Sequence, residues 1–177
     1  MILSLDQLQT PEPLLDQSRC QIIPARDLDP VLLFRWFKDY RTEALGASDT
    51  PEFHATVQAS VEETLEGNHR FALMVDGQPV ALAGFNAEVD DTVQIGPVWT
   101  PPVHRRQGYA RQLLAGILTS AQTRGISRAV LFTNNPYAEK AYAALGFQVN
   151  GAYRLCLFKE SSMPLRDEHL GTCPHIQ

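Results

Sequence analysis

Three basic residues surround a glycine at the start of a helical pattern in the segment PPVHRRQGYARQLL, residues 101–114. Arg105, Arg106 and Arg111 lie on either side of Gly108, and the apolar spacing that follows predicts a helix. The first amides of a helix have no intrahelical acceptor, and the helix dipole adds positive potential there. Glycine lets the backbone approach a ligand, and arginine adds charge-assisted hydrogen bonds. The segment therefore predicts a site for an anionic group such as a pyrophosphate.

The common phosphate-binding motifs are absent from the sequence. It contains neither G-x-G-x-x-G nor G-x-x-x-x-G-K-[ST], which excludes a dinucleotide fingerprint and a P-loop. A basic helix start is also more often a solvated corner than a binding site. This segment alone does not indicate a function, and a second motif elsewhere in the sequence is needed to support one.

Composition limits the class of protein. A chain of 177 residues with 44% hydrophobic and 20% charged residues predicts one globular domain. The apolar runs are too short to span a membrane, and residues 1–10 lack the features of a secretory signal, so we expect a cytoplasmic protein. A net charge of -5 disfavours nucleic-acid binding. Cys20, Cys156 and Cys173 are too few and too widely spaced for a disulfide framework or a zinc site, so no metal is expected.

Hydrophobic periodicity and turn signals divide the chain into an expected order of elements. In chain order these are a strand at 20–23, helices at 30–45 and 51–66, three antiparallel strands at 70–75, 79–89 and 92–100, a helix at 108–124, a strand at 128–133, a helix at 136–145, and strands at 147–149 and 153–158. The order predicts an α+β domain over residues 19–160, between an N-terminal arm (1–18) and a polar tail (161–177). Gly96-Pro97 predicts a break in pairing within the strand at 92–100.

Two segments together resemble one family. Residues 101–114 resemble motif A of the GCN5-related N-acetyltransferases (GNAT), Q/R-x-x-G-x-G/A, with Arg105, Gly108 and Ala110 in the defining positions. The segment NNPYAEKAYAALGF resembles the second signature of that family. The matching residues are Asn135, Ala138, Tyr142, Gly146 and Phe147. Both motifs lie on the expected elements and in the family's order.

The resemblance implies a fold and a cosubstrate. It implies a mixed, mostly antiparallel sheet of about seven strands, flanked by four helices, with a splayed gap between the fourth and fifth strands. Acetyl-CoA would bind with its pyrophosphate on the backbone of residues 106–111 and its pantetheine arm in the gap. The implied cofactor-binding residues are Val98, Trp99, Thr100, Arg105, Arg106, Gln107, Gly108, Tyr109, Ala110, Arg111, Asn135, Ala138 and Tyr142.

The resemblance also implies an activity, the transfer of an acetyl group to a primary amine by direct attack in a ternary complex. Tyr142 is the expected general acid, although packing in the core is the alternative for a tyrosine on an apolar stripe. The general base is open: Glu88, Glu43 and His104 are candidates, and a water chain or an already neutral amine would also serve. Gln94 occupies a plausible position on the strand at 92–100 but cannot act as a base.

A second function remains open beside the enzyme. The strand at 92–100 contains no acidic residue, which favours a CoA-binding or acyl-CoA-binding regulatory module without turnover. The acceptor, a small molecule or a peptide amine, cannot be read from the sequence. The aromatic residues of the first helices, Trp36, Phe37, Tyr40 and Phe53, could line its pocket, although such residues more often form a core. Family members often dimerise, so a homodimer is compatible with the sequence.

Overall fold

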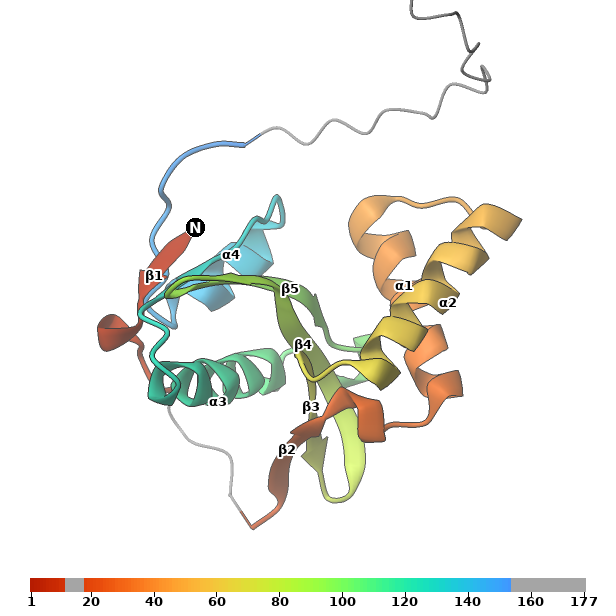
Figure 1. Ribbon diagram of the computed structural model, residues 1–177, viewed down its shortest axis with the longest axis horizontal. Coiled ribbons are helices and arrows are strands. Elements are labelled where there is room, and N and C mark those ends of the chain that lie inside the picture. The colour runs from red at the N-terminus through yellow and green to blue at the C-terminus, as the bar shows by residue number, and fades with distance from the viewer. Residues whose placement is uncertain (12–17, 154–177) are drawn as a thin grey trace, which may run out of the picture.

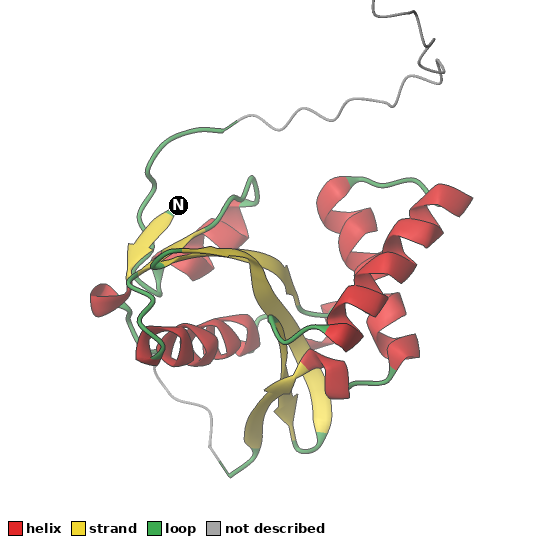
Figure 2. Ribbon diagram, in the orientation of Figure 1, coloured by secondary structure: helices red, strands yellow, loops and turns green. Residues whose placement is uncertain are grey.

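The computed structural model describes residues 1–11 and 18–153. The described residues form a single six-stranded sheet in the order β1-β6-β5-β4-β3-β2, with four α-helices (Figures 1 and 2). The strands are β1 (Ile2–Ser4), β2 (Cys20–Pro24), β3 (Arg70–Val75), β4 (Gln78–Val89), β5 (Thr92–Trp99) and β6 (Arg128–Val130). The helices are α1 (Pro30–Leu45), α2 (Pro51–Glu66), α3 (Tyr109–Thr123) and α4 (Pro136–Ala143). None of the described helices is long and apolar enough to cross a membrane.

Three of the helices begin as the sequence predicts. Asp29, Thr50 and Asn135 each precede a proline, and the side chain of each accepts a hydrogen bond from a backbone amide of the first turn. Proline at the first helical position has the φ angle that a helix requires and lacks an amide that would need an acceptor. These caps explain where α1, α2 and α4 start.

The sheet opens between β5 and β6. The two strands run parallel, but their register covers only residues 92–94 of β5, so the rest of β5 has no β6 partner. On the other side, Gly96 and Pro97 have no partner in β4, because the register between the two strands shifts there. This confirms the predicted splayed gap and the break at Gly96-Pro97. The gap is the opening beside β5 after Gln94.

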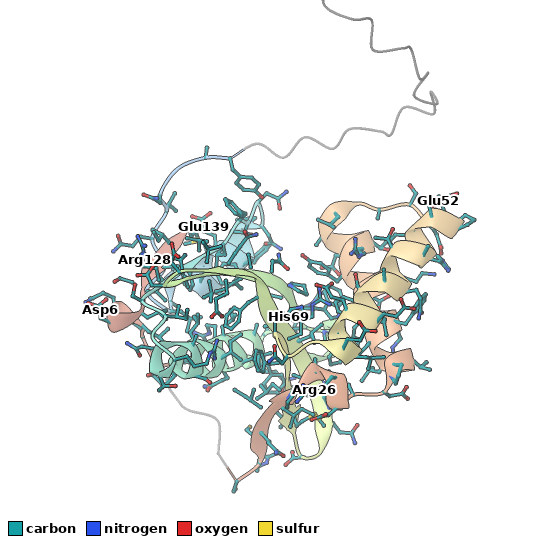
Figure 3. The ribbon with its side chains drawn as sticks, in the orientation of Figure 1. Asp6, Arg26, Glu52, His69, Arg128 and Glu139 are labelled. Atoms are coloured by element: carbon teal, nitrogen blue, oxygen red, sulfur yellow. The ribbon has the colours of Figure 1, made fainter. Side chains whose placement is uncertain are left out.

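The sheet separates two apolar cores. In Figure 1, α3 lies along one face of the sheet, α4 lies on the opposite side of it, and α1 and α2 pack together. Leu113, Leu114 and Ile117 of α3 belong to the first core, together with sheet residues such as Phe85 and Val93. The helices α1 and α2 cover the second core, whose sheet residues are Ala72, Leu82 and Trp99. In Figure 3, side chains fill both sides of the sheet, and His69, just before β3, lies between α3 and α2.

The N-terminus differs from the prediction of an arm over residues 1–18. Ile2–Ser4 form β1, which pairs antiparallel with β6, and Leu3 and Leu5 are each only 2% exposed. Three residues are too few to show a period, and their partner strand lies more than 120 residues away in the sequence, so local pattern could not reveal this strand.

The closing strands also differ from the prediction. Among the described residues the sheet has six strands instead of about seven, and β6 ends at Val130 instead of continuing to 133. Of the strand predicted at 147–149, Gln148 makes a single antiparallel bridge with Ile2. The strand predicted at 153–158, apart from its first residue, and the tail at 161–177 lie outside the described residues.

Candidate active site

The basic loop connects the end of β5 to the start of α3. Two of its residues have left-handed backbone conformations, with φ of 62° at Arg106 and 81° at Gly108. Gly108 is the N-cap of α3 and makes no side-chain hydrogen bond to the first turn. The other three α-helices have a capping side chain at this position. The first amides of α3 are therefore left without a side-chain cap, as an anion site on the backbone requires.

Space is open beside Gly108. A Cβ atom added there would meet only Nη2 of Arg111, at 3.6 Å. The guanidinium groups of Arg106 and Arg111 make no hydrogen bond or ion pair with any described residue. The uncapped helix start therefore lies between two arginines without partners among the described residues, and Gln107, Tyr109 and Ala110 belong to the same segment. Gln107 is held by Tyr109, whose hydroxyl donates to Gln107 Oε1 at 2.8 Å.

Arg105 differs from the other two arginines because it has partners within the chain. Its Nε donates to the backbone oxygen of Thr100 at 2.9 Å, and its Nη2 pairs with Oε2 of Glu43 at 2.8 Å. The guanidinium carbon also lies 5.0 Å from the centre of the Trp99 ring. The structure therefore directs Arg105 towards α1 and β5.

Two buried polar atoms near the gap have no partner among the described residues. These are Nε1 of Trp99 and Oγ1 of Thr100. Buried polar atoms in proteins are normally hydrogen-bonded, so an unpaired donor beside a gap indicates a group that a ligand can satisfy. Val98 to Thr100 also have no strand on the β6 side, so their backbone can pair with an extended ligand. The residues present fit the pantetheine arm of acetyl-CoA.

Tyr142 lies on α4, is partly buried and packs against the first core. Its ring meets that of Phe147 edge to face, with the centroids 6.1 Å apart. Burial, together with a smaller contribution from the nearby Tyr40, raises the pKa of Tyr142 to about 12. The hydroxyl therefore stays protonated at neutral pH, and it makes no hydrogen bond with any described residue. A protonated, unpaired hydroxyl is a proton donor.

The raised pKa of Tyr142 predicts a loss of stability at alkaline pH. The folded state binds this proton more tightly than the unfolded state, whose tyrosine pKa is 10.0. The contribution is therefore complete below pH 10 and is lost as the pH rises towards 12. Between those values, the unfolding free energy of the parent should fall more steeply than that of Tyr142→Phe, as measured by urea unfolding. Tyr137→Phe, on the same helix but 82% exposed, should behave like the parent. Identical slopes for the parent and Tyr142→Phe would contradict the assignment.

Aromatic residues from separate parts of the chain lie near Tyr40, which is itself near Tyr142. Tyr40 of α1 meets Trp99 edge to face at 6.2 Å. Burial raises the pKa of Tyr40, and nearby Tyr153 adds to that effect while Arg41 opposes it. Tyr153 in turn packs on Phe132, with the ring centroids 4.9 Å apart. Sequence reasoning missed Tyr153 and Phe132, because no local pattern links them to α1.

The other aromatic candidates for an acceptor pocket belong to the core. Trp36, Phe37 and Phe53 are 3%, 2% and 8% exposed, respectively, and pack between α1, α2 and the sheet. Tyr40, the fourth predicted pocket residue, is only partly buried, and its ring meets that of Trp99 and lies near Tyr142.

The candidate bases do not gather around Tyr142. Glu88 pairs in register with Val93, before the gap opens, and its Oε2 lies 3.4 Å from Nη2 of Arg124 beyond the end of α3. Glu43 is the partner of Arg105. The ring of His104 lies 6.4 Å from that of Tyr109 in the basic loop. Glu88 therefore contacts Arg124, and its predicted role as the base stays a prediction.

Asn86 is a polar residue beside the gap that sequence reasoning missed. A Cβ atom added to Gly96 would lie only 2.3 Å from Nδ2 of Asn86, so the amide covers Gly96 closely. Glycine at position 96 makes room for this side chain. The sequence shows a bulge there but gives no sign of which side chain covers it.

Asn135 and Ala138 begin the helix that carries Tyr142. Asn135 Oδ1 accepts from the amides of Tyr137 at 2.9 Å and Ala138 at 3.3 Å. The predicted cap is confirmed, and it sets the direction of α4 and thereby the position of Tyr142, one turn after Ala138.

A cavity of about 700 Å³ lies on the other side of the loop, between residues 101–104 and α1. It is lined by Asp29, Val31, Leu32, Arg35, Trp36, Asp39, Gln78, Pro79, Pro101, Pro102, Val103 and His104. None of the residues around Tyr142 lines it, so this cavity is separate from the gap.

Comparison with known proteins now identifies the family. The model of the acetyltransferase (GNAT) family matches residues 31–147. The chain belongs to the GNAT family. Among curated proteins, a UPF0039 protein of Schizosaccharomyces pombe is 33% identical to this GNAT chain over 88 residues. That match covers 49% of the chain and 59% of the relative, so it spans less than two thirds of the relative's length.

Solved structures share the GNAT fold. A possible acetyltransferase from Clostridium difficile 630 has a TM-score of 0.65 at 18% identity, covering 80% of this chain and 97% of that one. Spermidine N-acetyltransferase from Vibrio cholerae, in complex with CoA and spermine, has a TM-score of 0.61 at 16% identity, covering 76% and 84%. The PaiA N-acetyltransferase of Thermoplasma acidophilum, in complex with coenzyme A, has a TM-score of 0.57 at 10% identity, covering 76% and 92%. At these identities the likeness shows the fold.

Proposed function

We propose that this GNAT chain transfers the acetyl group of acetyl-CoA to a primary amine, by direct attack in a ternary complex. The observation that carries the proposal is the hydroxyl of the partly buried Tyr142, which is protonated and makes no hydrogen bond with any described residue. A group of this kind is what a departing thiolate needs. Family membership and the uncapped start of α3 support the same conclusion.

The chain's own residues would hold the cosubstrate along two elements. The amides of residues 106–111, with the side chains of Arg106 and Arg111, would bind the pyrophosphate. The backbone of Val98 to Thr100 would pair with the pantetheine arm, and Oγ1 of Thr100 would gain a partner. Asn135 and Ala138, at the start of α4, would contact the cosubstrate from the second motif.

In the proposed reaction, backbone amides and the side chain of Tyr142 have different tasks. Bound acetyl-CoA supplies an acyl thioester, which a neutral amine attacks to form a C–N bond while the C–S bond breaks. Backbone amides near Val98 would stabilise the negative charge on the carbonyl oxygen. Tyr142 would protonate the departing sulfur. The attacking amine would lose its proton to water, the Tyr142 phenolate would regain a proton from water, and Glu88, which faces Arg124, is not part of this proposal.

CoA should stabilise the folded protein. By mass action, a ligand at a hundredfold excess over its dissociation constant stabilises by about 2.7 kcal/mol. Thermal unfolding with and without saturating CoA measures this, and sodium sulfate at the same ionic strength is the control for a general anion effect. A rise in Tm with CoA that sulfate does not reproduce is the expected result. If sulfate raises the Tm and CoA does not, the site is a simple anion site.

Turnover distinguishes an enzyme from a CoA-binding regulatory module. The regulatory alternative remains because no described carboxylate lies unpaired beside Tyr142, and Glu43 and Glu88 both face arginines. Steady release of free thiol from acetyl-CoA with a panel of primary amines supports the enzyme. CoA binding without thiol release for any amine would favour the module.

The acceptor is proposed only as a class. The Vibrio cholerae neighbour is named for spermidine and holds spermine, a small polyamine. The net charge of -5 of the present chain suits a cationic amine of that size. We therefore propose small amines as the first acceptors to test, with peptide amines second.

A further inference from the structure

Arg105 links three parts of the site, all within the chain. Its Nε donates to the Thr100 oxygen at 2.9 Å, and its Nη2 pairs with Glu43 on α1 at 2.8 Å. Its guanidinium lies over Trp99, 5.0 Å from the ring centre. Two donors and one face of the guanidinium plane are therefore occupied. We call this set of contacts the Arg105 tie.

We propose that Arg105 is a positioning residue that fixes the basic loop against α1 through Glu43, and that it is not a phosphate ligand. This inference rests on the proposed function, because the loop is the proposed CoA site. It replaces the role that the motif implied for Arg105 and leaves the phosphates to Arg106, Arg111 and the amides of α3.

The backbone after Arg105 explains why such a tie is needed. Arg106 has a φ of 62°, a left-handed conformation that residues with a side chain rarely adopt. A conformation of this kind persists only where the surrounding structure holds it. Arg105 is the preceding residue, and its two hydrogen bonds fix it to both β5 and α1. Without the tie, the loop would sample other conformations and its amides would lose their common direction.

The Arg105 tie also gives Glu43 a structural role, whereas the sequence indicates it only as a possible base. Its carboxylate is half exposed, as is the Arg105 side chain, with relative exposures of 50% and 36%. An isolated ion pair at such exposure contributes little stability. Here the pair acts together with the contacts to Thr100 and Trp99, so its effect is to select one loop conformation.

The direction in which Glu43→Gln changes the CoA affinity distinguishes a phosphate ligand at position 105 from a positioning residue. If Arg105 were a phosphate ligand, removing the nearby negative charge would leave CoA affinity unchanged or raise it. If Arg105 positions the loop, Glu43→Gln weakens CoA binding by about two- to fivefold, within the range expected for one partly exposed ion pair. Asp39→Asn is the matched control, because Asp39 lies one turn earlier on α1, is exposed and makes no ion pair with any described residue.

The CoA affinities of Arg105 variants provide a second test of the positioning role. Arg105→Gln should weaken CoA binding by at least about tenfold, because it also removes the charged hydrogen bond and the contact with Trp99. Adding Glu43→Gln to Arg105→Gln should cause little further loss, because both changes break the same tie. Arg105→Lys keeps the charge but not the planar guanidinium, so it should behave like Arg105→Gln.

The experiment measures two quantities for each variant: the CoA dissociation constant by calorimetry, and amide hydrogen exchange of residues 100–111 without CoA. We expect Glu43→Gln and Arg105→Gln to weaken CoA binding and to speed exchange of the same amides, with Asp39→Asn unchanged in both. The inference is overturned if Glu43→Gln binds CoA as tightly as the parent, or if Arg105→Lys binds like the parent. A parent that does not bind CoA would instead contradict the proposed function, while the exchange data would still report whether the tie orders the loop.

Discussion

Replacing Gly108 with valine should weaken CoA binding by at least about 100-fold while the domain stays folded, since two lost charge-assisted hydrogen bonds at about 1.5 kcal/mol each amount to that factor. Gly108 has a φ of 81°, which a β-branched residue avoids, so valine would turn the loop and misdirect the amides of α3. Its side chain would also point into the space where the pyrophosphate would lie. Calorimetry with CoA measures the loss, and the Michaelis constant for acetyl-CoA should rise in parallel.

Gly125 provides a control for backbone strain. It lies beyond the other end of α3, has a φ of 97° and has no heavy atom within 4 Å of an added Cβ. Gly125→Val therefore introduces the same kind of strain away from the basic loop. We expect a similar decrease in Tm for both variants and a normal CoA affinity only for Gly125→Val. If Gly108→Val binds CoA within a factor of two of the parent, the loop is not the pyrophosphate site.

Local signals in the sequence predicted most of the fold. The cap-and-proline pairs at Asp29, Thr50 and Asn135 located the starts of three helices, because capping depends only on neighbouring residues. The Gly96-Pro97 break was equally local, since proline cannot donate to a strand ladder. The strand β1 was missed because its formation depends on pairing with β6, which no short segment can reveal.

The candidate site also contains parts that the sequence predicts and parts that it does not. The basic loop and the α4 signature could be predicted because each is a continuous motif. The partners of the side chains could not be, since they depend on how separate elements pack. Arg105 was expected at the phosphates but pairs with Glu43 on α1, 62 residues earlier. Glu88 lies next to Arg124 for a similar reason, because the sequence gives no register between β4 and the end of α3.

The structure also shows how the two motifs meet. α3 follows β5 and α4 follows β6, and these strands pair only over residues 92–94 of β5. The short pairing lets the two strands diverge, so the start of α3 and the helix with Tyr142 lie on two sides of one gap. The Gly96-Pro97 break and the short β6 would therefore allow the proposed cosubstrate to reach both motifs.

Removing the hydroxyl of Tyr142 should reduce kcat by at least about tenfold, since general acid catalysis typically contributes 10²–10⁴-fold. Tyr142→Phe keeps the ring that packs against Phe147, so the fold and the CoA affinity should change little. The pKa of about 12 keeps the hydroxyl protonated through the working range, so the parent should show no loss of rate from this group below pH 10. Steady-state rates with one amine acceptor, measured from pH 6 to 10, test both statements.

Two controls are needed for this comparison. One shows that a lower rate does not come from unfolding, and the other ensures that the chemical step limits kcat. Tyr137→Phe removes an exposed hydroxyl from the same helix and should keep the parent's kcat. A less reactive acyl donor or a poor amine, chosen so that chemistry limits the rate, makes the comparison valid, because product release limits the rate of many enzymes. If Tyr142→Phe unfolds cooperatively at the parent's temperature and still turns over at the parent's rate under those conditions, the hydroxyl takes no part in the reaction. The buried ring would then serve only to pack α4 against the sheet.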